Sequence, residues 1–160
     1  SLSPVMKGAF EQIYGPPYLT RMLFAEVGGR PEDDLFLRVE YDGEIGSNGA
    51  TYARARQDFG VLSGTRQSVE LMEAFLKSEH KPDAPFETAV NSALDAWSVG
   101  HMLLQASETK ELPGRDDIAQ HRQEQLAIAA IEAAVLERDG SRPIRYRSLT
   151  DKELRSIIGQ

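Results

Sequence analysis

The 160-residue chain contains no cysteine. Disulfide bonds, thiolate zinc sites and cysteine nucleophiles are therefore excluded, and the composition is compatible with a reducing compartment. Basic residues are also in deficit, because 18 Lys and Arg stand against 25 Asp and Glu, which gives a net charge of −7. Phosphate contacts need clustered basic side chains, so the sequence predicts no nucleic-acid partner.

Long hydrophobic runs are missing as well. No stretch approaches the roughly 20 apolar residues of a membrane span, and residues 1–7 lack the apolar core of a signal peptide, so we expect no membrane partner. What is present is ordinary globular composition, with 41% hydrophobic and 27% charged residues. Length and composition together predict a single domain over residues 1–160, or a large part of one, with a hydrophobic core.

Three segments near the start have the character of β-strands. Tyr18–Val27 mixes aromatic and β-branched residues, and Asp34–Tyr41 alternates apolar with polar side chains, as in a strand with one buried face. Phe59–Leu62 is a short apolar run and is predicted to be a buried strand. Between the last two, Asp42-Gly43 is typical of a hairpin turn.

Two helices are predicted next. Thr65 is a plausible N-cap of the first, and Pro82 ends it. The second begins near Pro85, with Asp83 as its expected cap. Apolar residues recur at helical spacing in both, which predicts one buried face for each helix. These residues are Val69, Met72, Phe75 and Leu76 in the first helix, and Phe86, Val90, Leu94 and Trp97 in the second.

The last third is harder to interpret. Residues 105–125 are polar and predict a loop or a partly helical insertion. Leu126–Leu136 is ambiguous, because its alanines favour helix while its continuous apolar character suits a buried strand. Ile144–Ser148 alternates as a strand, and a capping box at Thr150–Glu153 predicts a final helix that ends at Gly159. Strands, paired helices, strands and a helix predict an α+β fold with helices layered on antiparallel sheets.

The glycine-rich loop at Gly46–Gly49 invites two interpretations as a binding site. It lacks the lysine of a Walker loop and no helix follows it closely, so a hairpin loop is favoured over a phosphate cradle. Asp42, Glu44 and Asn48 superficially resemble calcium ligands, but the glycine and the distal glutamate of a calcium loop are missing at the required offsets. We therefore expect no metal there.

The three histidines, His80, His101 and His121, lie far apart in the sequence. None has a second His or a Glu at the spacing of metal ligands, so we expect solvated or capping side chains. No nucleophile-elbow pattern favours a serine-histidine-acid triad. The sequence accordingly predicts no catalytic, cofactor-binding or metal-binding residue, and no cofactor.

Two further groups were weighed as functional residues. A free N-terminal serine can attack a carbonyl with its own amine as base, but Ser1 leads into helix-like sequence rather than into a strand, so we expect no catalytic role. Five basic side chains do not form one stripe and are expected to be solvated or interface charges rather than a ligand clamp. They are Arg54, Arg56, Arg66, Lys77 and Lys81.

The order of segments resembles the C-terminal half to two-thirds of α-type proteasome subunits, in particular the actinobacterial kind. PYLTRMLFAEVGGRPEDDLFLRVEYDGEI, Pro17–Ile45, is similar to the family's strand pair with its tyrosine-aspartate-glycine turn. Phe59–Trp97 resembles the strand, small-residue turn and two helices that follow. Ile131–Ile158 resembles the closing strand pair and last helix, and VMKGAFEQIYGPP, Val5–Pro17, the tail of a preceding helix.

This resemblance implies a four-layer αββα sandwich of the N-terminal-nucleophile (Ntn) hydrolase type, without a nucleophile. It implies a cytoplasmic, non-catalytic subunit of the outer ring, which gates substrate entry for ATP-dependent protein degradation. The implied partners are copies of itself in a seven-membered ring, β-type subunits, and an ATPase or other activator. It also implies that Leu126–Leu136 is a strand and that Asp42-Gly43 is a plain hairpin turn.

Residues 105–125 depart from the family, because they form a longer loop than expected, and the family's first third has no counterpart in the chain. Two alternatives stay open. One is a β-type subunit or stand-alone Ntn hydrolase, a threonine- or serine-type peptidase or amidase whose nucleophile is not seen. The other is an unrelated α+β binding module with the same order of segments.

Overall fold

A computed structural model describes residues 4, 7–8, 11, 20–46, 58–105, 111–139 and 145–159. The segment Val5–Pro17, which resembles the tail of a helix, lies almost wholly outside these residues. The chain forms two compact units, Ser1–Leu62 and Ser63–Gln160. Among the described residues, none of the helices combines the length and the apolar character that a membrane span requires.

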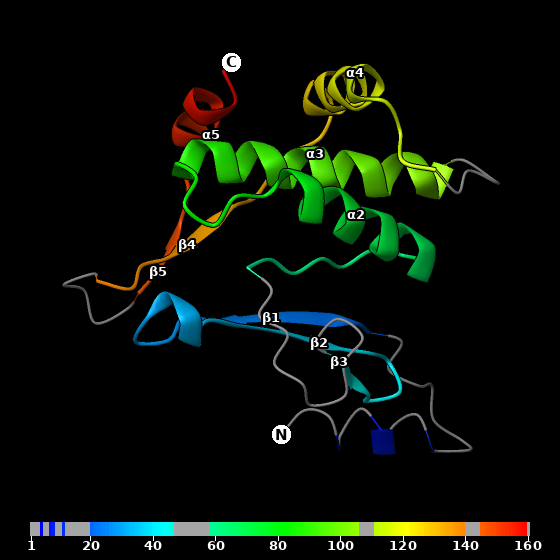
Figure 1. The fold of residues 1–160 in the computed structure, drawn as a ribbon, viewed down its shortest axis with the longest axis vertical. Coiled ribbons are helices and arrows are strands. Elements are labelled where there is room, and N and C mark those ends of the chain that lie inside the picture. Colours follow the sequence, from blue (N-terminus) through cyan, green and yellow to red (C-terminus); the bar gives the residue numbers. More distant parts are fainter. Residues whose placement is uncertain are drawn as a thin grey trace. The chain divides into compact units, whose positions relative to one another are not determined.

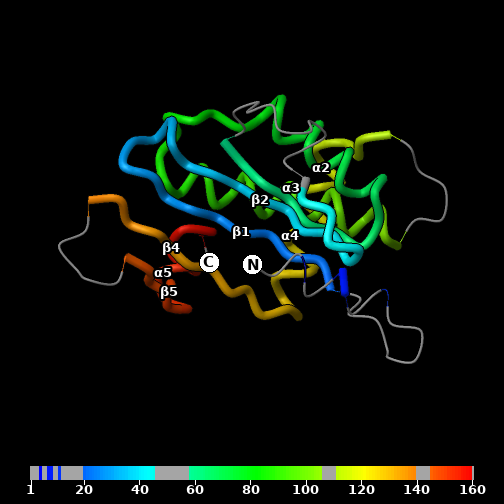
Figure 2. Tube along the Cα trace, turned by 90° about the horizontal axis from the view of Figure 1, so that it is seen from below, coloured from blue at the N-terminus to red at the C-terminus, as the bar shows by residue number. Residues whose placement is uncertain are grey.

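The first unit is built around an antiparallel sheet in the order β1-β2-β3. Strand β1 is Met22–Glu26, β2 is Leu35–Val39 and β3 is Ile45–Gly46, with a 3-10 turn, η1, at Pro31–Asp33. Figure 2 shows β1 and β2 side by side, in the register that pairs Met22 with Val39 and Glu26 with Leu35. Both predicted strands are confirmed, within shorter bounds.

The turn between β2 and β3 is the predicted Asp42-Gly43 hairpin. Gly43 has φ of 83°, a left-handed conformation that glycine adopts without strain, and its N–H donates to the Glu40 carbonyl at 2.9 Å. Asp42 Oδ1 accepts from the Glu44 N–H at 2.9 Å and closes the turn from its side chain.

The strand predicted at Phe59–Leu62 is wrong, because these residues lie outside the strands of the structure. Their apolar character reflects packing instead. Val61 is buried, and Gly60 lies so close to β1 and β2 that an added Cβ would meet Leu23 Cδ1 at 3.0 Å and Phe36 Cβ at 3.2 Å. Hydrophobicity indicates burial, but a strand also needs a backbone partner, which a four-residue run does not specify.

The second unit begins with helix α2, Arg66–Glu79. Thr65 is its N-cap, as predicted, and Ser68 completes a capping box with it. Ser68 Oγ also donates to Ser63 Oγ at 2.7 Å. The predicted apolar stripe is confirmed at Val69, Met72 and Leu76, which are buried.

Helix α3, Phe86–Gln105, is the central helix of this unit and contacts α2, α4 and α5. In Figure 1 it runs between α2 and α4. The Pro85 carbonyl accepts the first helical bond, from Ala89, so the cap position is Pro85 and the expectation of Asp83 is wrong. Of the predicted stripe only Leu94 is buried. The other buried residues, Ala96, Ser98, Val99 and Gly100, are small, because neighbouring helices pack closely on more than one side.

Helix α4, Arg115–Leu126, occupies much of the range 105–125, so this range is partly helical. The buried strand expected at Leu126–Leu136 is wrong over most of its length. Residues 127–133 have no regular structure, and Ile128 is 80% exposed. Only Ala134–Leu136 forms a strand, β4.

Strand β4 pairs antiparallel with β5, Tyr146–Ser148, which confirms the strand predicted there. The chain then enters α5, Asp151–Ile158, through the predicted capping box of Thr150 and Glu153, and Gly159 ends the helix at φ of 77°. Leu154 of α5 is buried. The described residues thus form an α+β fold, with two short antiparallel sheets and four helices, α2–α5.

Candidate functional site

The residues that were considered as phosphate or calcium ligands, and were expected to form a plain hairpin loop, do not converge on a site within the described residues. Asp42 is engaged in the hairpin turn, and Gly46 pairs with Arg38 in the sheet. Asn48 and the rest of Gly46–Gly49 lie outside the described residues. No group of three or more His, Asp or Glu side chains in the described part of the chain is placed to hold a metal ion.

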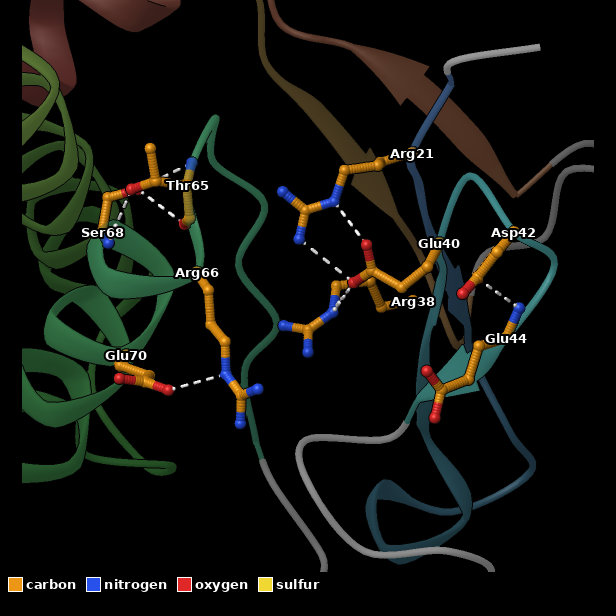
Figure 3. A network of polar contacts seen from close by, with 9 residues as sticks. All are labelled: Arg21, Arg38, Glu40, Asp42, Glu44, Thr65, Arg66, Ser68 and Glu70. Atoms are coloured by element: carbon orange, nitrogen blue, oxygen red, sulfur yellow. Dashed lines mark hydrogen bonds and ion pairs between the residues drawn. The ribbon is translucent and has the colours of Figure 1, made fainter. Parts of the chain in front are cut away.

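The basic side chains considered above are dispersed, as far as they lie within the described residues. Arg66 Nε lies 3.0 Å from Glu70 Oε1 on the exposed face of α2 (Figure 3), an ordinary surface pair of helical neighbours. Lys77 and Lys81 are exposed near the end of α2. Ser1, Arg54 and Arg56 lie outside the described residues, so their roles stay predictions.

A carboxylate with two arginines lies on the first sheet and was not predicted. Arg21 forks onto Glu40, with Nε donating to Oε2 at 2.5 Å and the second nitrogen to Oε1 at 3.1 Å. Arg38 Nε lies 2.8 Å from Glu40 Oε1 (Figure 3), in an ionic contact rather than a well-directed hydrogen bond. The Arg21 bonds are the largest cause of a Glu40 pKa below 4.5.

A histidine pair joins α3 to α4, contrary to the expectation of separate, solvated rings. His101 Nδ1 and His121 Nε2 are 2.9 Å apart, and the ring centroids are 5.0 Å apart. The two nitrogens therefore face one another, as in a hydrogen bond. They do not both point toward a common third atom. His80 lies apart from the pair, at the C-cap of α2.

The histidine pair is covered by Trp97, one helical turn before His101. The Trp97 and His101 rings stack, with centroids 5.1 Å apart and planes 10° apart. His121 is 9% exposed, and its Nδ1 is buried without a hydrogen-bond partner among the described residues. Burial is the main reason why the pKa of His121 lies below 6.5, and His101 lowers it further.

A hollow of about 190 Å³ lies where α2, α3 and α4 meet. The residues of two ion pairs line it. Arg115 of α4 reaches Glu79 of α2 at 2.6 Å, and Arg122 of α4 reaches Asp95 of α3 at 2.8 Å. Phe75, Ile118 and Ala119 supply its other lining.

The Asp95 carboxyl, which lines this hollow, has a shifted pKa. Burial raises its pKa above 3.8, Arg122 opposes that rise, and Glu79 adds to it. Arg122 also donates to Asn91 Oδ1 at 3.3 Å, and Asn91 in turn donates to the Ile157 carbonyl of α5 at 3.2 Å. These contacts link three helices, which is a structural arrangement rather than a catalytic one.

The chemistry available to these groups is proton sharing and ion pairing. Within the described residues, the hydrogen-bonding and ring contacts of the histidine pair are with each other, Trp97 and Gln105, and no hydroxyl among these contacts completes a nucleophile-base arrangement. The pair was missed because its members are 20 residues apart, and only the crossing of α3 and α4 joins them.

Comparison with known proteins finds one informative relative. The chain is 25% identical over 144 residues, 90% of its length, to a protein of Nocardioides sp. named proteasome subunit alpha. The chain spans 45% of the length of that relative. No protein-family model matches the chain, and no solved structure matches it.

Proposed function

Because the chain is related to α-type proteasome subunits, we propose that it serves as a non-catalytic α-type subunit of a proteasome core particle. The observation that carries the proposal is the extent of the similarity, which runs over 90% of the chain rather than over one motif. The α+β order of elements supports it, with strands β1–β3 first, then helices α2–α4, the strand pair β4–β5 and the final helix α5.

The proposed particle has the form implied by the resemblance. The chain contributes to an αββα sandwich of the Ntn type and forms the outer, seven-membered ring with copies of itself. Such a ring needs heterologous contacts, in which one face of each subunit matches a different face of the next. β-type subunits would supply the peptidase, and an ATPase or other activator would deliver substrate in the cytoplasm.

Native mass spectrometry of the protein purified from its source tests this proposal. We expect a seven-fold assembly that contains a second, β-type subunit, and peptidase activity only in that assembly. A matched assay of the purified chain alone on fluorogenic peptides should give no turnover.

Two results would contradict the proposal. A chain that stays monomeric or dimeric when mixed with its β-type partner would restrict the relationship to the fold. Peptide hydrolysis by the chain alone, abolished by substitution of a single hydroxyl residue, would favour an Ntn hydrolase instead.

A further inference from the structure

Helix α4 is attached to its unit mainly through polar contacts. Ile118 and His121 are its buried residues, and the rest of its side chains are exposed or half-buried. Its polar contacts with other helices include the two ion pairs of the hollow, the Arg122–Asn91 bond and the histidine pair. An amphipathic helix buries an apolar stripe, so α4 lacks the usual source of helix attachment.

The histidine pair can hold α4 only in certain protonation states. With both rings neutral, one N–H donates to the other ring's lone pair across the 2.9 Å separation. One added proton leaves such a bond in place, because one facing nitrogen still has a lone pair. Two added protons put an N–H on both facing nitrogens and two like charges side by side, so the bond is lost and the rings repel.

The other charged groups around the contact do not remove this repulsion. Glu124, on α4 itself, favours the charged form of His121, but burial and His101 act more strongly in the opposite direction. From α3, Asp95 is paired with Arg122, and from α2, Glu79 is paired with Arg115. Gln105, 3.5 Å from His101, is neutral and can accept or donate after an amide flip.

We propose that α4 is a proton-sensitive element, which stays attached to α3 while the histidine pair carries at most one proton and detaches when it takes up the second. Detachment uncovers His121 and Ile118 and opens the hollow between α2, α3 and α4. Acidification thereby changes the surface that this face of the second unit presents.

The direction and size of the effect follow from proton linkage. Once detached, His121 titrates near the ordinary histidine pKa of 6.5. Below that pH the detached state binds about one proton more than the attached state, so attachment weakens by about tenfold per pH unit. The loss stops when the pH falls below the depressed pKa of the attached pair.

Hydrogen exchange of the full chain measures this directly. After correction for intrinsic exchange, protection of the α4 amides should fall about tenfold per pH unit below about pH 6.5, while α2 amides keep their protection. Nitrogen-15 spectra should report a depressed pKa for the His121 ring. An ordinary pKa for His121 would overturn the proposal even if every variant misfolds.

Substitutions assign the effect to the pair. His121→Gln removes the second charge, so α4 protection should become independent of pH in the same range. His101→Gln removes the repulsion but leaves His121 buried, so it should reduce the pH response without abolishing it. His80→Gln is the matched control and should behave like the unsubstituted chain. Asp95→Asn should lower the protection of the α4 amides at every pH, without changing the pH range over which that protection falls. A pH response that survives in His121→Gln, or that disappears in His80→Gln, would refute the role of the pair.

Discussion

Single residues of α3 set how closely its neighbours approach. A Cβ added at Gly100 would lie 2.4 Å from Met72 Sδ and 3.1 Å from Met72 Cγ, and Met72 is buried. Gly100 is therefore the point at which α2 packs against the backbone of α3, and Met72 fills the space that a larger residue would occupy.

We expect Gly100→Ala to destabilise the protein by about 1–3 kcal/mol, because overpacking against Met72 outweighs the gain of up to about 1 kcal/mol in helix propensity. Urea denaturation measures the change. Shortening the neighbour in a Met72→Val/Gly100→Ala double variant should recover part of the loss. Equal costs of Gly100→Ala in both backgrounds would show that Met72 is not the obstacle.

Glu40 should make the first unit sensitive to acid. Its pKa lies below 4.5 in the folded protein because Arg21 and Arg38 favour the carboxylate. The resulting stabilisation is present above 4.5 and is lost as the pH falls through the lower, folded-state pKa. Thermal unfolding followed across this range should show a loss that Glu40→Gln abolishes. Asp42→Asn, which leaves the arginines untouched, should retain it.

At the scale of elements, the two ion pairs that hold α4 differ in how exposed their side chains are. The Arg122 and Asp95 side chains are 27% and 31% exposed, whereas Arg115 is 81% exposed. A half-buried pair loses more when one partner is removed, because the remaining charge is left partly desolvated. An exposed pair is screened by water and salt.

Arg122→Ala should therefore lower the free energy of unfolding by about 1–3 kcal/mol. Arg115→Ala should lower it by less than about 1 kcal/mol. Denaturant unfolding of both variants gives the comparison, and a double-mutant cycle with Asp95→Ala isolates the pair. Added salt should reduce the Arg115 effect more than the Arg122 effect. The reverse order of costs would mean that the exposed pair holds α4.

At the scale of the whole molecule, β1 is the edge of its sheet among the described strands. Leu23 and Phe24 on this strand are 37% and 39% exposed. An apolar strand edge is a template for pairing with another chain. The isolated protein should accordingly self-associate, whatever partners it has in its source.

Sedimentation velocity over a wide range of concentrations measures this association. Phe24→Lys should reduce it, since a charge on an edge strand opposes pairing. Ala74→Lys, which adds the same charge to an exposed position of α2, is the control and should have little effect. A clean monomer at high concentration would contradict the prediction.

The features predicted well from the sequence are those that depend on neighbouring residues. Thr65 and Thr150 cap their helices through bonds to residues three positions away, and Asp42-Gly43 turns the chain within five residues. Such contacts form wherever the local backbone allows, so residue type and spacing determine them. The α+β character follows from the same local patterns.

Tertiary structure decided what depends on distant partners. Apolar character led to a strand at Phe59–Leu62 and left Leu126–Leu136 open between helix and strand, because a pattern reports burial but not backbone pairing. The resemblance to the family then implied a strand across Leu126–Leu136, of which only Ala134–Leu136 forms. The histidine pair and the Arg122–Asp95 contact join residues 20 and 27 positions apart. They exist only because α4 crosses α3, a crossing that packing between helices sets and that no local spacing encodes.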